Sequence, residues 1–184
     1  MEKLKKHFGG MGFSADELEE IYNSFTLREF KKHDYFIEAG QISQLLGFIE
    51  SGMFQYYVVK KGEIKTTFVS VENNFVVSLH SFASGTSSLE YVKALSDVEV
   101  YIISKADLKI LIDKIGKFKD FNITLVESKI CRISGRLHSL IVLSGDQRYE
   151  KMLNEEPHLL QQIPLQYLAS MLGVTPRHLS RIRK

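Results

Sequence analysis

The middle of the chain, residues 27–103, alternates short apolar runs with turn-forming residues. The runs are rich in β-branched and aromatic residues and cover 35–37, 45–49, 53–59, 64–69, 75–79 and 98–103. The turn signals between them are Ala39-Gly40, Ser51-Gly52, Lys61-Gly62, Asn73-Asn74 and Ser84-Gly85. Many short strands at this spacing predict an antiparallel β-roll or barrel.

Helical periodicity flanks this β-rich region on both sides. Ser14 and Glu17 have the spacing of a capping box. The apolar residues that follow lie on one helical face: Leu18, Ile21, Tyr22 and Phe25. Ser104 and Asp107 repeat the capping signal before a second periodic segment, which we expect Gly116 to end. The pattern therefore predicts an α+β protein.

Residues 117–143 predict one long helix of roughly 40 Å, at about 1.5 Å per residue. Its main apolar seam alternates in steps of three and four and consists of Ile123, Val126, Ile130, Ile133, Leu137 and Leu140. A second, broken stripe consists of Phe118, Phe121 and Leu125. We interpret the seam as a homodimer interface and the second stripe as packing on the roll. The alternative is a helix buried in its own domain, since the seam is short and Gly135 interrupts it.

Residues 163–182 have the pattern of a helix-turn-helix. Leu168 and Leu172 form the inner face of a first helix, and Ala169 is small where a second helix must cross closely. Gly173 allows a tight turn. Thr175 is a suitable N-cap, and Pro176 follows at the first helical position, where a missing N–H costs nothing. The buried side of the second helix is predicted to consist of Val174, Leu179 and Ile182.

The side chains left outward on that second helix are of types that contact base edges and phosphates. They are Arg177, His178, Ser180 and Arg181. Arginine can bond guanine through two parallel hydrogen bonds, whereas a lone histidine more often contacts phosphate or solvent than a base. The motif therefore predicts binding to double-stranded DNA.

Charge supports this interpretation, and composition excludes several other classes of protein. Residues 1–144 hold 18 basic and 18 acidic residues, whereas residues 145–184 hold 6 basic and 4 acidic ones. The single cysteine, Cys131, excludes a disulfide framework, a cysteine-only zinc site and an iron–sulfur cluster, and it fits a cytoplasmic protein. Residues 1–10 lack the apolar run of a signal peptide, and we expect no membrane span and no cofactor.

Over nearly its full length the chain resembles the Crp/Fnr family of bacterial transcription regulators. The resemblance rests on the element order, on Gly40 and Gly52 in the roll, and above all on residues 168–184. It implies a roll of the cyclic nucleotide-binding type (a double-stranded β-helix), a homodimer on a two-fold-related operator, and RNA polymerase as a further partner. It also implies base contacts by Arg177 and Arg181 and phosphate contacts by Gln166 and Thr175.

The chain departs from the relatives that bind cyclic nucleotides. Those relatives carry a glycine–glutamate pair and, about ten residues on, an arginine–serine pair. The aligned positions here are Val77-Ser78 and Ser88-Leu89, which lack both charges. A phosphate without its arginine is costly in a partly buried pocket, so we expect no response to cyclic AMP or cyclic GMP. An unknown small-molecule effector remains open, and its candidate pocket residues are Val77, Ser78, Thr86, Ser87, Ser88 and Leu89.

We expect three parts: a sensor-like roll with flanking helices at 1–116, a dimerisation helix at 117–144, and a DNA-binding domain at 145–184. The first alternative to a DNA-binding protein is an enzyme. His33 and His80 are isolated, and no catalytic motif is present, so the sequence predicts no enzyme. The second alternative is a β-roll that binds a protein or a small molecule and carries a vestigial helix-turn-helix.

Overall fold

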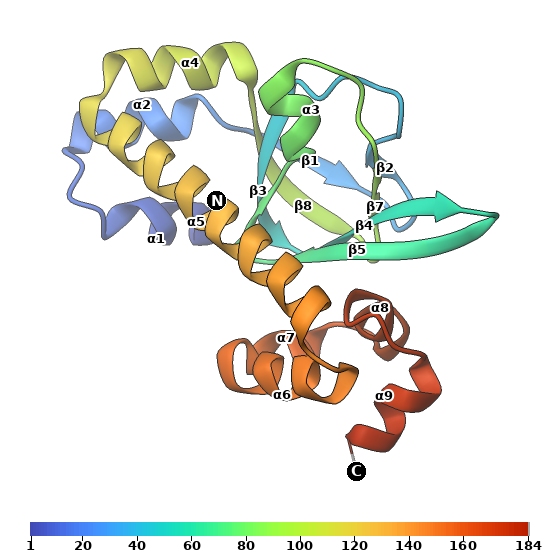
Figure 1. Cartoon of the computed structure of the whole chain (residues 1–184). Helices are drawn as coiled ribbons and strands as arrows, with labels where there is room; N and C mark the ends of the chain where they lie inside the picture. The colour runs from blue at the N-terminus through green and yellow to red at the C-terminus, as the bar shows by residue number, and fades with distance from the viewer. Residues whose placement is uncertain (184) are drawn as a thin grey trace.

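A computed structural model describes residues 1–183 and confirms the α+β fold class (Figure 1). Two four-stranded antiparallel sheets form the roll. The first sheet has the order β1 (Thr26–Phe30), β8 (Val98–Ser104), β3 (Leu45–Ser51) and β6 (Phe75–Val76). The second has the order β2 (Tyr35–Ile37), β7 (Tyr91–Ala94), β4 (Met53–Lys60) and β5 (Glu63–Val71).

The roll has its own apolar core, which alternate strand residues supply. Phe30, Ile49, Phe54, Val92 and Val100 are among its buried members. Gly52 closes the turn between β3 and β4 at φ +87°, and a Cβ there would lie 2.4 Å from the Asp97 carbonyl oxygen. Only glycine fits that turn without displacing backbone.

Strands β1 and β7 and the short helix that follows β6 were not predicted. β1 has only Phe30 buried, and β7 has four residues, so neither carries a strong alternating pattern. The predicted strand at 75–79 is wrong at its end, because β6 stops at Val76 and Leu79 begins α3 (Leu79–Ser84). Its C-cap, Gly85, has the left-handed conformation that commonly ends a helix.

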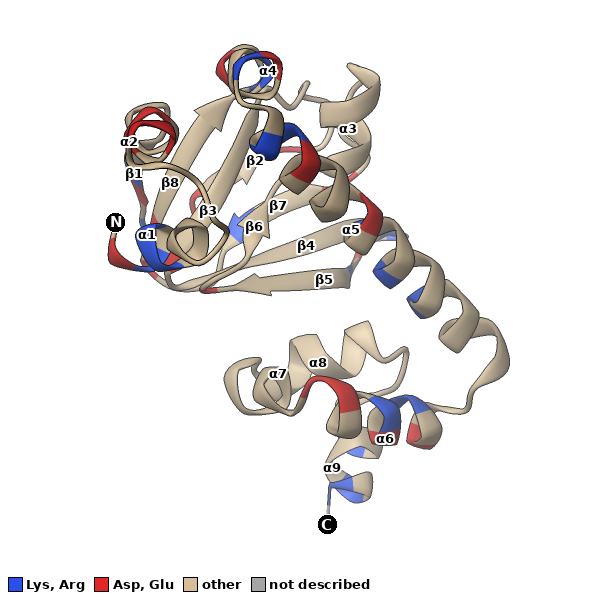
Figure 2. Cartoon of the chain, turned by 90° about the vertical axis from the view of Figure 1, so that its left-hand side faces the viewer, with Lys and Arg blue, Asp and Glu red and all other residues tan. Residues whose placement is uncertain are grey.

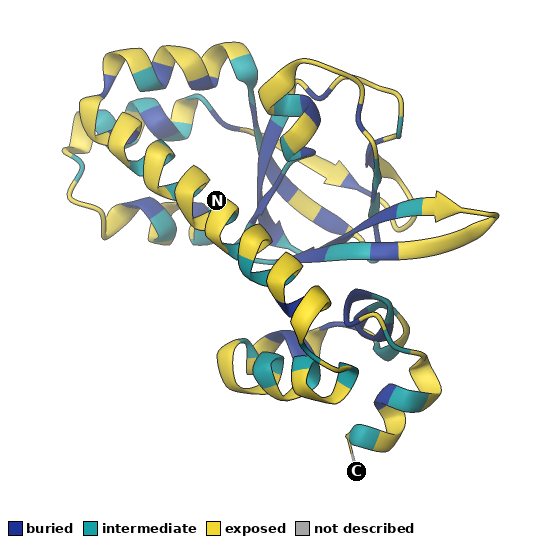
Figure 3. Ribbon diagram, in the orientation of Figure 1, coloured by how far each residue is buried: buried dark blue, intermediate teal, exposed yellow. Residues whose placement is uncertain are grey.

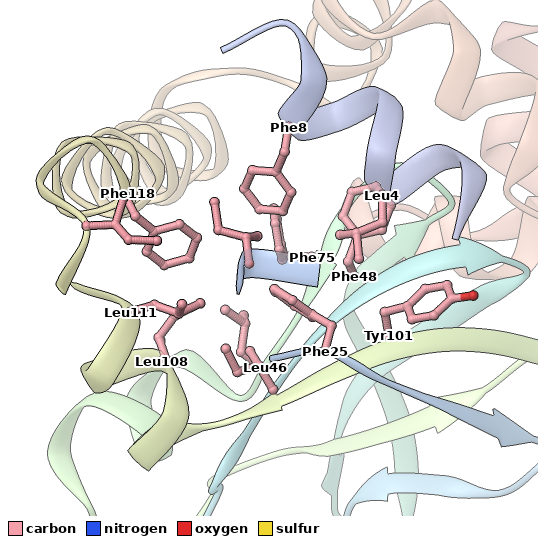
Figure 4. Packing of buried hydrophobic residues seen from close by; sticks show 13 residues of the cluster. Leu4, Phe8, Phe25, Leu46, Phe48, Phe75, Tyr101, Leu108, Leu111 and Phe118 are labelled. Atoms are coloured by element: carbon pink, nitrogen blue, oxygen red, sulfur yellow. The ribbon is translucent and has the colours of Figure 1, made fainter. Parts of the chain in front are cut away.

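A second core joins the first sheet to a layer of helices (Figure 4). The helices are α1 (Glu2–Gly9), α2 (Ala15–Asn23), α4 (Lys105–Lys114) and the first turns of α5 (Gly116–Val142). The capping box of Ser14 and Glu17 is present, and the Ser104 hydroxyl caps α4, as predicted. Helix α1 was not predicted, although its Leu4 and Phe8 are completely buried.

Helix α5 crosses the molecule from this helical layer to the C-terminal helices (Figure 1). Phe118 is buried, and Phe121 and Leu125 pack partly against the same core, which confirms the predicted second stripe. The predicted long helix is continuous, and Gly135, which interrupts the apolar seam, lies within it. One helical glycine costs only about 1 kcal/mol, which neighbouring turns of a long helix can tolerate.

The chain ends in four helices: α6 (Gly145–Glu155), α7 (Pro157–Gln162), α8 (Leu165–Met171) and α9 (Pro176–Ile182). They share a third apolar core with β5, to which Val69 and Val71 contribute. The C-terminal helices are therefore packed on the roll. Within residues 1–183, no helix combines the length and the apolar character needed to cross a membrane.

Candidate nucleic-acid interface

The last two described helices, α8 and α9, are joined by a tight turn that has the predicted geometry. Gly173 has φ +66°, and the Val174 N–H donates to the Ala169 carbonyl oxygen at 3.0 Å. The Thr175 hydroxyl accepts a hydrogen bond from the His178 N–H at 3.2 Å, so Thr175 is the N-cap of α9. Pro176 follows at the start of the helix. These local interactions fix where α9 begins and how it leaves the turn.

Apolar residues on the inner sides of α8 and α9 hold the two helices together. Leu168, Ala169 and Leu179 are completely inaccessible to solvent. Val174 and Ile182 are partly buried against the same cluster. The interior positions predicted from the sequence are therefore interior in the structure.

Two arginines that the sequence analysis did not single out support the end of α8. Arg136 on α5 donates to the Met171 carbonyl oxygen at 2.9 Å, and Arg148 on α6 donates from Nε to the Leu172 carbonyl oxygen at 2.7 Å. Cations at a helix C-terminus satisfy its free carbonyl groups and oppose its dipole. The turn before α9 is thereby connected to both α5 and α6.

The outward side of α9 carries the candidate DNA contacts, and Figure 2 shows its basic positions at the end of the chain. Arg177, Ser180 and Arg181 are exposed, and His178 is half-buried. No acidic residue lies on α9 itself. The surface that α9 presents to solvent is therefore basic and rich in hydrogen-bond donors.

His178 is bonded on both sides of its ring. Its Nε2 lies 2.6 Å from Oδ1 of Asp146, at the start of α6, and its Nδ1 lies 3.0 Å from Nη2 of Arg181. The imidazole therefore connects a carboxylate on one helix to a candidate base-reading arginine on another. Nothing in the sequence separates Asp146 from any other first-turn acid, so this contact could not be predicted.

Helix α8 is docked on the roll through the β4–β5 hairpin. A register shift opposite Tyr56 and Tyr57 interrupts the ladder near Thr66. The Thr66 N–H donates to the Ser170 hydroxyl at 2.8 Å, and that hydroxyl lies 3.4 Å from the Thr66 carbonyl oxygen. Gln166, exposed in the first turn of α8, lines a cleft of about 380 Å³ between α8 and the second sheet. The roll and the helix pair are thus in direct polar contact.

Helix α5 completes this junction with a row of basic side chains. The Arg132 guanidinium lies 5.0 Å from the centre of the Phe68 ring on β5 and pairs with Glu156 between α6 and α7. Burial lowers the pKa of Lys129 and of Arg136, and the charge of Arg132 adds to both effects. This basic side of α5 faces inward, whereas the candidate dimer seam faces solvent.

The candidate dimer seam lies exposed along α5 (Figure 3). The exposed fractions are 46% for Ile123, 38% for Val126, 57% for Ile130, 58% for Ile133, 59% for Leu137 and 44% for Leu140. Six large apolar side chains in one row along a single helix form an apolar patch that monomeric proteins rarely leave in water.

Two of the candidate effector-pocket residues meet inside the roll. The hydroxyl groups of Ser78 and Ser88, the positions aligned with the missing glutamate and arginine, lie 2.9 Å apart and are buried. Val77 is half-buried, and its N–H donates to the Tyr56 hydroxyl at 3.0 Å. Thr86, Ser87 and Leu89 are exposed and stand apart from this buried pair. The two hydroxyls are thus paired with each other, and Ser88 also accepts a hydrogen bond from the Glu90 N–H at 3.3 Å.

The ionisable side chains of residues 1–183 do not gather into a metal site. Among residues 1–183, no group of three or more histidine, cysteine, aspartate or glutamate side chains has the arrangement to hold a metal ion. Burial raises the pKa of the Glu90 carboxyl, which accepts a hydrogen bond from Thr67 at 3.0 Å. The backbone of Glu90 contacts the serine pair, since the Ser88 hydroxyl donates to the Glu90 carbonyl oxygen at 2.7 Å.

Comparisons with known proteins agree with this architecture. Residues 27–114 match the cyclic nucleotide-binding domain family. A CooA mutant from Carboxydothermus hydrogenoformans is 11% identical, with a TM-score of 0.72 over 96% of this chain and 80% of that one. FixK2 from Bradyrhizobium japonicum is 12% identical, with a TM-score of 0.73 over 86% and 82% of the two chains.

The catabolite activator protein of Thermus thermophilus is 17% identical, with a TM-score of 0.61 over 96% of this chain and 84% of that one. No curated protein matches the chain by sequence. At sequence identities of 11 to 17%, these similarities show that the chain shares a fold with the solved structures. Residues 27–114 are therefore similar to cyclic nucleotide-binding domains, and the chain as a whole shares its fold with these solved proteins and with a Crp/Fnr-family protein from Eubacterium rectale, which is 15% identical with a TM-score of 0.66.

Proposed function

We propose that the protein is a homodimeric, sequence-specific DNA-binding transcription regulator of the Crp/Fnr type. The observation that carries this proposal is the outward side of α9, where Arg177, Ser180 and Arg181 are exposed while Leu179 is fixed in the core. A helix held in this way can enter a major groove with its donors directed at base edges. In this interpretation α8 and α9 form a helix-turn-helix, and the protein is not an enzyme.

Dimerisation would place two copies of α9 on one face of the assembly. The exposed seam of α5 supports this, because pairing two such helices removes its apolar side chains from water. A two-fold dimer reads two half-sites, and its affinity is therefore much higher than that of one helix pair. Gln166 at the start of α8 and Thr175 at the N-cap of α9 are the proposed phosphate contacts.

We expect Arg181→Ala to weaken binding to the preferred DNA site by roughly 1 to 3 kcal/mol, which is about 5- to 150-fold. The reason is loss of a bidentate contact with guanine. Fluorescence anisotropy on the preferred site, and on a site with that base pair changed, measures the effect. Equal loss on both sites would show that Arg181 contacts only phosphate.

Wild-type protein is expected to show no saturable binding of cyclic AMP or cyclic GMP by titration calorimetry. Serines at positions 78 and 88 supply neither a cation for the cyclic phosphate nor a carboxylate for the ribose, and their hydroxyls are buried against each other. A stoichiometric heat of binding with either nucleotide would contradict this part of the proposal. Other small molecules remain candidate effectors for the residues around that pair.

A further inference from the structure

We propose that Asp146 is a positioning residue for DNA recognition, which acts through the His178 imidazole to hold the Arg181 guanidinium. This inference rests on the proposed function and assigns a new role within it. The observation behind it is a pair of hydrogen bonds that joins Asp146, His178 and Arg181. These bonds connect the start of α6 to the outward side of α9.

The close approach of α6 and α9 is built into the chain. A Cβ on Gly145 would lie 2.4 Å from Cγ1 of Val174 and 3.6 Å from Nε2 of His178. Glycine at this position therefore lets the first turn of α6 pack closely against Val174, in the turn that leads into α9. The capping box of Ser144 and Gln147 fixes that turn, and so fixes the backbone from which Asp146 projects.

The direction of both hydrogen bonds follows from the groups involved. A carboxylate only accepts, so Nε2 of His178 carries a proton and donates a hydrogen bond to Asp146. A guanidinium only donates, so Nδ1 must be unprotonated to accept from Arg181. Asp146 thereby favours a proton on Nε2, and the tautomer that carries its proton there also offers Nδ1 as an acceptor to Arg181.

Holding the guanidinium matters because a bidentate contact to guanine requires a fixed orientation. An arginine restrained before binding loses less conformational freedom when it meets the base. Without Asp146 the imidazole can rotate or change tautomer, and Arg181 loses its acceptor. The expected consequence is weaker discrimination at the one base pair that Arg181 reads, with the affinity for other DNA unchanged or higher.

A double-mutant cycle tests this coupling on DNA. Asp146→Ala should reduce affinity for the preferred site about three- to tenfold, in the range of coupling between residues in one hydrogen-bond network. The same substitution in an Arg181→Ala background should cause no further loss. Glu150→Ala, which removes an exposed acid from the same helix, is the matched control and should not weaken discrimination. An equal loss from Asp146→Ala in both backgrounds would overturn the proposal.

A second readout needs no DNA. Nitrogen-15 NMR of the imidazole, recorded at a pH above which its shifts no longer change, should show His178 protonated at Nε2 and bare at Nδ1. Asp146→Asn keeps an acceptor oxygen, so it should preserve this tautomer and most of the discrimination, whereas Asp146→Ala should lose both. A wild-type imidazole protonated at Nδ1 would overturn the proposal. If no DNA site can be selected, the proposed function fails. The NMR measurement still shows whether the hydrogen bonds that join Asp146, His178 and Arg181 form.

Discussion

Ile130→Asp is expected to convert the protein into a monomer and to reduce its affinity for a two-fold DNA site by more than about a hundredfold. Ile130 lies near the middle of the α5 seam and is 57% exposed in the single chain. In a dimer the substitution would bury two carboxylates close to the two-fold axis, each at a desolvation cost of several kcal/mol. A monomer would then hold only one half-site.

Sedimentation velocity measures the first effect and a DNA titration measures the second. Ile133→Asp should behave in the same way, since Ile133 is three residues further along the seam. Ser128→Asp places the same charge on an exposed position of α5 outside the seam, and it should remain dimeric. A folded Ile130→Asp variant that still sediments as a dimer would refute the seam assignment.

Leu179→Ala is expected to destabilise the C-terminal helices by about 2 to 5 kcal/mol, the range for truncating a fully buried leucine. Leu179 is the residue of α9 that has no solvent-exposed surface, and it belongs to the core shared by β5, α7 and α8. A cavity at this place would weaken the packing of α9 against the rest of this core. We therefore expect a lower melting temperature together with a large loss of DNA affinity.

Circular dichroism during heating, combined with the DNA titration, tests this expectation. Ser180→Ala is the matched control, because Ser180 is the exposed neighbour on the same helix, and its substitution should change stability by no more than about 0.5 kcal/mol. A Leu179→Ala variant with wild-type melting and wild-type DNA affinity would show that the core does not position α9.

The elements that could be predicted from the sequence are those marked by residues close together along the chain. The strands at 45–51, 53–60 and 63–71 carry dense β-branched and aromatic runs, and turn glycines bound them. The turn before α9 was predictable because Gly173, Thr175 and Pro176 each fill a position with a specific backbone requirement. The second stripe of α5 was predictable from spacing alone.

Contacts between distant segments were not predictable in this way. Arg136 and Arg148 reach carbonyl groups at the end of α8, 35 and 24 residues further along the chain, and an arginine on a helix has no pattern that reveals such a partner. Asp146 and His178 are separated by 32 residues. The docking of Ser170 on Thr66 depends on a register shift in β5, which periodicity does not reveal.

The central claim, sequence-specific DNA binding by a two-fold dimer, is tested most directly by selection from a random pool of double-stranded DNA. We predict enrichment of a palindromic site whose half-sites lie about one helical turn apart, roughly 34 to 36 Å. Affinity for that site should fall steeply as salt rises, since phosphate contacts release counterions. A folded dimer that enriches no sequence even at low salt would contradict the claim.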